Sequence, residues 1–247
     1  MTALAALTER SLLYTLRDGA IVFEVLVPVA SLVGLTVATH GLIDTGRMTY
    51  PQYLLPAVVV QSMVMAAALT ADRAGRDRIY GLGVRLRTLP IAAIVPVSAR
   101  ITATLVRAGI ALAAAMTAGV VFGFRMTGGL GYGLAFVALA LLLCLAVALG
   151  ADALGSSKGS LEGTSQVLLV PQLVLILLST GVAPEKTFPE WLRPFVRNQP
   201  VSQTAETLRG LSTGQVSFDH LAAGLGWCVG MLLVFGGITL RMQRRGR

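Results

Sequence analysis

Charged residues, histidine and cysteine are all scarce in this sequence of 247 residues. Only 13% of the residues are charged, whereas 55% are hydrophobic and the mean hydropathy is +0.75. A soluble domain carries about a quarter charged residues. A chain with half that share has too little polar surface to cover a globule in water. The composition therefore predicts a protein that lies largely within a membrane.

The two histidines, His40 and His220, and the two cysteines, Cys144 and Cys228, have no metal-ligand spacing and form no disulfide framework. Each cysteine lies inside an apolar block and is predicted to be a buried free thiol. We find no residues at a spacing that would support catalysis. The sequence thus predicts no enzyme activity, and no metal or other cofactor, in this chain.

One segment resembles a phosphate-binding loop but does not meet its requirements. Residues 150–160 read Gly-Ala-Asp-Ala-Leu-Gly-Ser-Ser-Lys-Gly-Ser, yet Lys158 stands two places too late and no strand precedes it. We therefore expect the chain not to bind nucleotide by this route. Nucleic acid is not an expected partner either, because no part of the chain is long enough to fold into a separate basic domain.

The apolar residues form continuous blocks of 19 to 25 residues, which favours helices over the alternating strands of a barrel. About 20 helical residues cross a hydrocarbon core of about 30 Å. The predicted fold class is an all-α integral membrane protein, with six transmembrane helices in a single membrane domain over residues 1–247. The predicted spans lie near 20–39, 53–71, 98–122, 130–150, 164–182 and 221–240.

The distribution of arginine and lysine predicts the orientation, since basic residues collect in cytoplasmic loops. With a cytoplasmic N-terminus, twelve basic residues fall inside and six fall outside. Both termini are then cytoplasmic, as an even number of spans requires. The richness in alanine, glycine and arginine indicates a GC-rich bacterial genome, so we expect a multi-pass protein of the bacterial plasma (inner) membrane.

Three segments outside the spans carry further patterns. Residues 1–19 show a modest amphipathic pattern, which predicts a helix at the cytoplasmic interface; a short soluble lead-in is the alternative. The basic loop 72–97 places five arginines between apolar residues. It is either a topology anchor or a docking surface for a partner. Residues 183–220 form the longest outer segment and are predicted to contain two short helices, over 188–196 and 202–211. This segment is either a lid at an exit or a belt that anchors the fifth span.

Charged residues inside the predicted spans are candidates for function because charges in hydrocarbon are costly. They are Glu24 in the first span and Arg100 and Arg107 in the third. Glu24 and Arg100 lie at matched depth, and Arg107 lies about two turns deeper, so the partner of Glu24 stays open. Snorkelling to the headgroups is the favoured interpretation for Arg100. No series of acidic residues crosses the membrane, so a proton relay is not expected.

Three stretches of the sequence carry a resemblance to a known family. The most specific is Phe188-Pro-Glu-Trp-Leu-Arg-Pro-Phe-Val-Arg-Asn-Gln-Pro with Leu208-Arg-Gly-Leu behind it, which is similar to a Pro-x-Trp…Asn-Pro…Leu-Arg-x-Leu signature, although Gln199 stands where Asn usually precedes the proline. Gly83-Val-Arg-Leu-Arg-Thr-Leu-Pro-Ile is similar to a coupling segment, and residues 10–18, followed by a span with Pro28, are similar to an interfacial helix and a first membrane helix. By these stretches the chain resembles, over nearly its whole length, the ABC type-2 exporter permeases, close to the daunorubicin-resistance type.

The resemblance implies the permease half of an ATP-driven exporter of an amphipathic, drug- or lipid-like substrate. Such chains pair with an identical or a sister permease in the lipid membrane, and each docks a separate ATPase subunit that binds the ATP and Mg. The substrate path would lie at the dimer interface, lined mainly by spans one, two and five. The residues implied for coupling are Arg78, Tyr80, Arg85, Arg87, Leu89 and Pro90. Those implied for the outer element are Phe188, Trp191, Phe195, Pro200 and Arg209.

Other functions stay open at this point. Within exporters, a haem- or polysaccharide-exporter-type permease is the nearest alternative. A membrane scaffold subunit would use the same basic loop to dock a partner that is not an ATPase. An intramembrane transferase would need several polar residues that converge at one membrane depth, and the sequence alone does not show such a cluster.

Overall fold

The computed structural model describes residues 19–38, 49–81, 94–157, 164–181 and 183–245, together with residues 5, 7–11, 13, 88 and 92. All regular structure in this part of the chain is helical. Residues 5, 7–11 and 13 are helical within the expected interfacial helix. The elements that follow are α2 (Ala20–Ala38), α3 (Tyr50–Ile79), α5 (Val95–Val121), α6 (Gly129–Gly155), α7 (Thr164–Leu177), the 3₁₀ turn η1 (Glu185–Thr187), α8 (Arg193–Asn198), α9 (Pro200–Thr213) and α10 (Phe218–Arg245).

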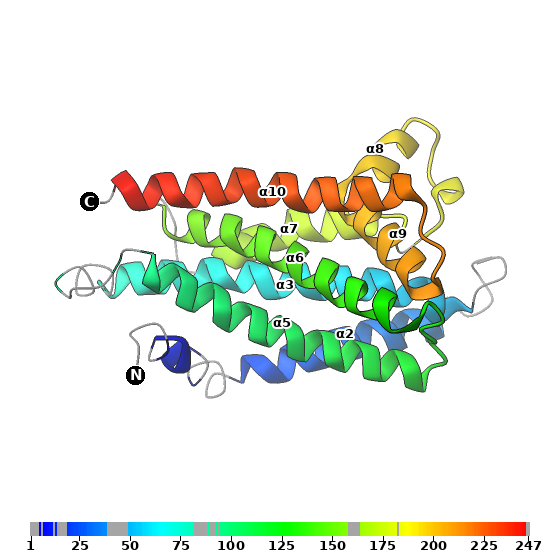
Figure 1. Ribbon diagram of the computed structural model, residues 1–247, viewed down its shortest axis with the longest axis horizontal. Helices are drawn as coiled ribbons and strands as arrows, with labels where there is room; N and C mark the ends of the chain where they lie inside the picture. Colours follow the sequence, from blue (N-terminus) through cyan, green and yellow to red (C-terminus); the bar gives the residue numbers. More distant parts are fainter. Residues whose placement is uncertain are drawn as a thin grey trace.

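The long helices lie side by side along the long axis of the molecule (Figure 1). Helix α3 is central and contacts α2, α5, α6, α7 and α9. Its buried residues include many alanines, which allow neighbouring helices to approach closely. The core is therefore a bundle around α3, and α2, α5, α6, α7 and α10 expose apolar side chains on their outer faces.

Four helices, α3, α5, α6 and the Phe218–Met242 part of α10, are long and apolar enough to cross a membrane. Helix α2 has a shorter apolar stretch, Ile21–Val37, and α7 has 14 residues. The expected all-helical membrane architecture is thus confirmed, and helices occupy the positions of all six predicted spans.

The two ends of the bundle differ. The N- and C-terminal parts of the chain lie at one end, where α3 ends and α5 begins (Figure 1). We call this the termini end. Helices α8 and α9 lie at the opposite end, which we call the α9 end. The arrangement brings the predicted coupling region and both termini to the same end of the molecule.

The expected loop over 72–97 is shorter than its predicted bounds, because α3 continues to Ile79 and α5 already begins at Val95. The extension carries opposite charges four residues apart, at Asp72 with Arg76 and at Arg73 with Asp77. This spacing supports a helix beyond the apolar span. Part of the predicted loop is therefore a rigid continuation of the central helix.

The two helices predicted within 183–220 exist with different bounds. The first is only α8, because Pro194 stands at the start of a helix and favours its first turn. The second, α9, begins at Pro200 and ends at Thr213, and the next residue, Gly214, has a φ of +74° that suits glycine. Most residues of α9 are buried against α3, α6 and α10. Helix α9 is therefore part of the bundle core at this end.

Candidate functional site

A three-residue ionic cluster joins three helices at the termini end. Arg100 of α5 donates from Nε to Asp152 Oδ1 of α6 at 2.6 Å, and from Nη1 to Asp77 Oδ2 of α3 at 3.2 Å. We call Arg100, Asp77 and Asp152 the Arg100 clasp. The N-terminal Arg10 lies 3.9 Å from Asp77 and adds a weaker contact. The clasp thus fixes the end of α3 to the start of α5, on either side of the predicted coupling segment.

The expectation that Arg100 snorkels to the headgroups is wrong. Its side chain is 11% exposed and is held by two carboxylates within the protein. Asp77 lies in the helical extension that was predicted to be loop, and Asp152 lies beyond the predicted fourth span. Both carboxylates are available to Arg100 because α3 and α6 extend past their apolar blocks.

The predicted coupling residues are only partly described. Arg78 donates from Nη1 to the Ser157 carbonyl, which links the end of α3 to the residues after α6. Tyr80 follows α3 directly, and its side chain is 71% exposed. Gly81, with a φ of +66°, turns the chain away from the helix. Arg85, Arg87, Leu89 and Pro90 lie outside the described residues.

A close approach of two helices lies beside the clasp. A Cβ atom at Gly155, the last residue of α6, would lie 2.0 Å from the Ala71 carbonyl oxygen of α3. Only glycine permits this backbone contact. The termini end of α6 is therefore pressed against α3 where Asp152 reaches Arg100.

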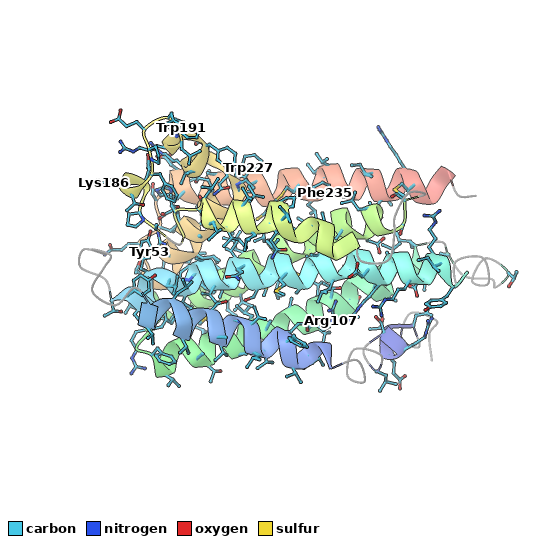
Figure 2. The ribbon with its side chains drawn as sticks, turned by 180° about the vertical axis from the view of Figure 1, so that it is seen from behind. Tyr53, Arg107, Lys186, Trp191, Trp227 and Phe235 are labelled. Atoms are coloured by element: carbon cyan, nitrogen blue, oxygen red, sulfur yellow. The ribbon has the colours of Figure 1, made fainter. Side chains whose placement is uncertain are left out.

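A second ion pair lies inside the bundle. Arg107 of α5 donates from Nη1 to Glu24 Oε1 of α2 at 2.5 Å, and neither side chain is more than 6% exposed. Its Nη2 donates to Thr104 Oγ1 at 2.9 Å, and this hydroxyl also bonds to Thr70 of α3 at 2.9 Å. Figure 2 shows Arg107 within the bundle, away from Tyr53 and Trp191. Glu24 thus pairs with Arg107, and the polar contact spans α2, α5 and α3.

The α9 end is held by Arg209. Its guanidinium carbon lies 3.8 Å from the centroid of the Tyr53 ring, and its Nε and Nη2 donate to the Tyr53 carbonyl at 3.3 and 3.1 Å. Nη1 pairs with Glu206 at 2.8 Å, and the Tyr53 hydroxyl donates to the Thr180 carbonyl at 2.5 Å. We call Arg209, Tyr53, Glu206 and Thr180 the Arg209 latch. It ties α9 to the start of α3 and to the turn after α7.

Gln199 caps the end of α7. Gln199 is the residue before α9. Its side-chain Nε2 donates to the Leu178 carbonyl at 2.6 Å and to the Leu175 carbonyl at 3.0 Å. Carbonyls at a helix end need such partners when they are buried. The residue that departs from the family signature therefore caps α7, whose last turn is buried at Ile176 and exposed at Val174 and Leu177.

The aromatic residues predicted for the outer element lie before and within α8. Trp191 is 79% exposed and Phe195 is 49% exposed, whereas Phe188 is partly buried. Figure 2 shows Trp191 at the extremity of the α9 end, near Lys186. Exposed aromatic side chains beside a charged residue are typical of a membrane interface.

Several residues of these clusters were not predicted. Asp77 and Asp152 could have been considered because both are acidic residues in the termini-end parts of α3 and α6, and a buried arginine needs a partner. No sequence pattern indicated the contacts of Tyr53 and Gln199, because each side chain contacts residues that are distant in the sequence. Among the described residues, no group of three or more His, Cys, Asp or Glu could hold a metal ion, and both cysteines are buried and free.

Comparison with known families gives an extensive match. The family described as ABC-2 family transporter protein matches residues 29–241. The matched segment covers nearly the whole bundle, from α2 to α10.

Curated relatives also cover most of the chain. The probable doxorubicin resistance ABC transporter permease protein DrrC of Mycobacterium tuberculosis (strain ATCC 25618 / H37Rv) is 29% identical over 236 residues, which are 92% of this chain and 83% of that protein. The daunorubicin resistance ABC transporter permease protein DrrB1 of Streptomyces coeruleorubidus is 30% identical over 226 residues, 89% of this chain and 78% of that protein. The doxorubicin resistance permease DrrB of the same M. tuberculosis strain is 29% identical over 201 residues, 78% of this chain and 70% of that protein.

Proposed function

This chain belongs to the ABC-2 family of transporter proteins and is the membrane component of an ABC exporter, and we propose that it moves an amphipathic substrate outward under the control of a separate ATPase subunit. The observation that carries the proposal is the family match over residues 29–241. The drug-resistance names of the relatives support a drug-like or lipid-like substrate. A haem- or polysaccharide-exporter-type permease is a less favoured alternative, because the relatives carry drug-resistance names.

The proposed topology has six crossing helices, α2, α3, α5, α6, α7 and α10, with both termini in the cytoplasm of a bacterium. The shared position of the termini at one end of the bundle supports an even number of crossings (Figure 1). The excess of basic residues at this end supports its cytoplasmic location. Helix α2, with 19 residues, is long enough to cross a bilayer of about 30 Å, and the 14 described residues of α7 form the shortest of the six proposed crossings.

The ATPase subunit would dock at the segment between α3 and α5, with ATP and Mg bound by that subunit. The Arg100 clasp supports this assignment, because it joins the two helices that flank the segment. A force applied to the segment would then move α3 and α5 together, and α3 contacts five other helices of the bundle. The clasp would convert the closing motion of the ATPase into movement of the core.

The functional unit would contain a second permease copy, either identical or a sister chain. Helices α2 and α7 support this proposal because both carry exposed apolar residues and pack on the same central helix α3. Membrane lipid would cover the remaining apolar faces. The scaffold alternative would use the same surfaces without an ATPase. The transferase alternative has weaker support, since the polar clusters are joined into ion pairs and carry no pairing of nucleophile with base.

The proposal is tested with the transporter reconstituted in liposomes with its ATPase subunit, by following ATP hydrolysis and uptake of an amphipathic dye. The double variant Arg85→Glu plus Arg87→Glu should abolish the ATP hydrolysis that the permease stimulates, while membrane insertion is unchanged. The matched control is Arg125→Glu plus Arg197→Glu, which makes the same charge change at exposed arginines of the α9 end. Normal hydrolysis in the first variant, or an equal loss in both, would contradict the docking assignment.

A further inference from the structure

The termini end of α10 carries a short basic sequence where its apolar span ends. The part of α10 that is apolar enough to cross a membrane ends at Met242, and the helix itself continues to Arg245. The arginines of this last part of the helix are Arg241, Arg244 and Arg245. Residues three and four positions apart lie on the same face of a helix. One face of α10 therefore ends in three arginines, which we call the α10 basic face.

The α10 basic face is directed away from the bundle. Thr239 Oγ1 donates to the Leu149 carbonyl of α6 at 3.2 Å, so the Thr239 side of α10 faces α6. At about 100° per residue, the three arginines lie about 140° to 240° around the helix from Thr239. Leu233 and Val234 lie on the same half of the helix, and they are 70% and 59% exposed. The arginines therefore continue the outermost apolar face of α10, and Arg241 itself is exposed.

Within the described part of the chain, the helices that contact α10 offer these arginines no free carboxylate. No acidic residue follows Asp219 in the sequence, and Asp219 lies in the first turn of α10, at the α9 end. Helix α10 packs on α6 and α9 and lies at the edge of the bundle in both views (Figures 1 and 2). The one acidic residue of α6, Asp152, is held by Arg100. That of α9, Glu206, pairs with Arg209 at the α9 end. The α10 basic face is thus open to a partner from outside the bundle.

We propose that the α10 basic face binds the phosphate group of an anionic phospholipid in the membrane leaflet at the termini end. The exposed apolar residues before the arginines suit the acyl chains, and the guanidinium groups suit the phosphate, which they can bind through two hydrogen bonds. The proposed second permease copy lies against α2 and α7, so this face of α10 remains open to lipid. The inference rests on the proposed topology, in which the termini end is cytoplasmic.

A basic tail that only sets the orientation of α10 makes a different prediction. Such a tail needs positive charge on the cytoplasmic side and has no preference among lipids. A site for an anionic phospholipid does have one, because each arginine beside a membrane span raises the affinity for anionic lipid about five-fold. Phosphatidylglycerol and phosphatidylcholine separate the two cases, since both carry a phosphate but the choline cation cancels its charge.

The test is a titration of the purified full-length chain in mild detergent with each of these two lipids, in which native mass spectrometry counts the bound lipid. The chain should bind phosphatidylglycerol about ten-fold more tightly than phosphatidylcholine. The preference should decrease as the concentration of ammonium acetate is raised, because salt screens charges at an exposed surface. Equal binding of the two lipids would overturn the proposal.

Three triple variants connect the preference to the α10 basic face. Glutamine at all three arginines should remove the preference for phosphatidylglycerol. Lysine at the same positions keeps the charge and should retain a reduced preference, because lysine lacks the planar fork. The matched control removes three exposed positive charges at the α9 end and should keep the full preference; it is Arg125→Gln, Lys186→Gln plus Arg197→Gln. An equal loss in the control and in the glutamine variant of α10 would refute the site.

A protein partner is the other occupant that this surface could have, and the ATPase subunit tests for it. The glutamine variant of α10 should still co-purify with the ATPase from its own host, because lipid and not protein occupies the face. Loss of the ATPase together with unchanged binding of phosphatidylglycerol would assign the arginines to a protein partner and refute the lipid site. A chain that shows no lipid preference but still stimulates its ATPase would refute this site and leave the proposed function standing.

Discussion

The guanidinium group of Arg209 stacks over the Tyr53 ring at 3.8 Å and also donates two hydrogen bonds to the carbonyl of the same residue. The two residues are 156 positions apart, in α9 and α3. Their contact binds the α9 end to the central helix, just as the Arg100 clasp binds the opposite end. The bundle is thus fastened around α3 by one arginine at each end, and between them Arg107 pairs with Glu24.

Arg209 should be essential for the stability of the α9 end. Arg209→Ala would leave Glu206 and the Tyr53 carbonyl without their donor, and should reduce the free energy of unfolding by about 3 kcal/mol. Arg209→Lys keeps the charge but loses the planar fork, and should cost about 1–2 kcal/mol. The measurement is unfolding in detergent followed by circular dichroism. Arg197→Ala, at an exposed arginine of α8, is the control and should change stability by less than about 0.5 kcal/mol.

The Arg100 clasp should show strong energetic coupling in a double-mutant cycle. Arg100→Gln should lower stability by about 3 kcal/mol, because it leaves the buried Asp152 carboxylate without its cation. Asp152→Asn should lower stability by less, because Arg100 keeps its contact with Asp77. The double variant should lose less than the sum of the two. The reference pair is Arg193 with Glu190, whose charged groups lie 3.7 Å apart and whose side chains are 36% and 90% exposed. This pair should couple by less than about 1 kcal/mol. Additive losses at Arg100 and Asp152 would show that the two side chains do not interact.

These two clusters show what could be predicted from the sequence. The helical class and the likeness to ABC-2 permeases followed from long apolar blocks and local signatures, and both are confirmed. The partners of Arg100 were missed because the predicted spans ended where the apolar blocks end. Helices α3 and α6 continue into polar sequence and carry Asp77 and Asp152 with them.

The partner of Glu24 is a second feature that could not be predicted from the sequence. Depth counted from helix ends matched Glu24 with Arg100 and placed Arg107 about two turns deeper, because such a count treats the helices as parallel and level. The structure decides for Arg107, since helix stagger and packing around α3 set which residues meet. Contacts between distant segments, such as Tyr53 with Arg209, leave no local pattern in a single sequence.

Replacing glycine by alanine should lower the free energy of unfolding at one helical position and raise it at another. Gly155→Ala would place a methyl group against the Ala71 carbonyl and should lower the free energy of unfolding by about 2 kcal/mol, as overpacking of this kind does. Gly226→Ala meets no atom within 4 Å and should raise stability by about 0.5 kcal/mol through helix propensity. Both are measured by unfolding in detergent. A neutral Gly155→Ala would mean that α6 and α3 do not approach this closely.

The proposed topology places Trp191 outside the cytoplasm. Trp191→Cys should react with a membrane-impermeant thiol reagent in intact cells, because this position is 79% exposed at the α9 end. The native cysteines, Cys144 and Cys228, are buried and serve as an internal control that should stay unlabelled. If the Trp191→Cys variant is labelled only after the cytoplasmic side has been made accessible to the reagent, the bundle has the opposite orientation to the one proposed.

The exporter assignment is tested most directly by a pull-down of the tagged chain in mild detergent from its own host, assayed for co-purifying subunits and for ATP hydrolysis. An ATPase of separate sequence should co-purify in stoichiometric amount, with hydrolysis that depends on the permease. A stable assembly of the chain that contains no ATPase, isolated from a host that carries the neighbouring genes, would contradict this assignment and favour the scaffold alternative.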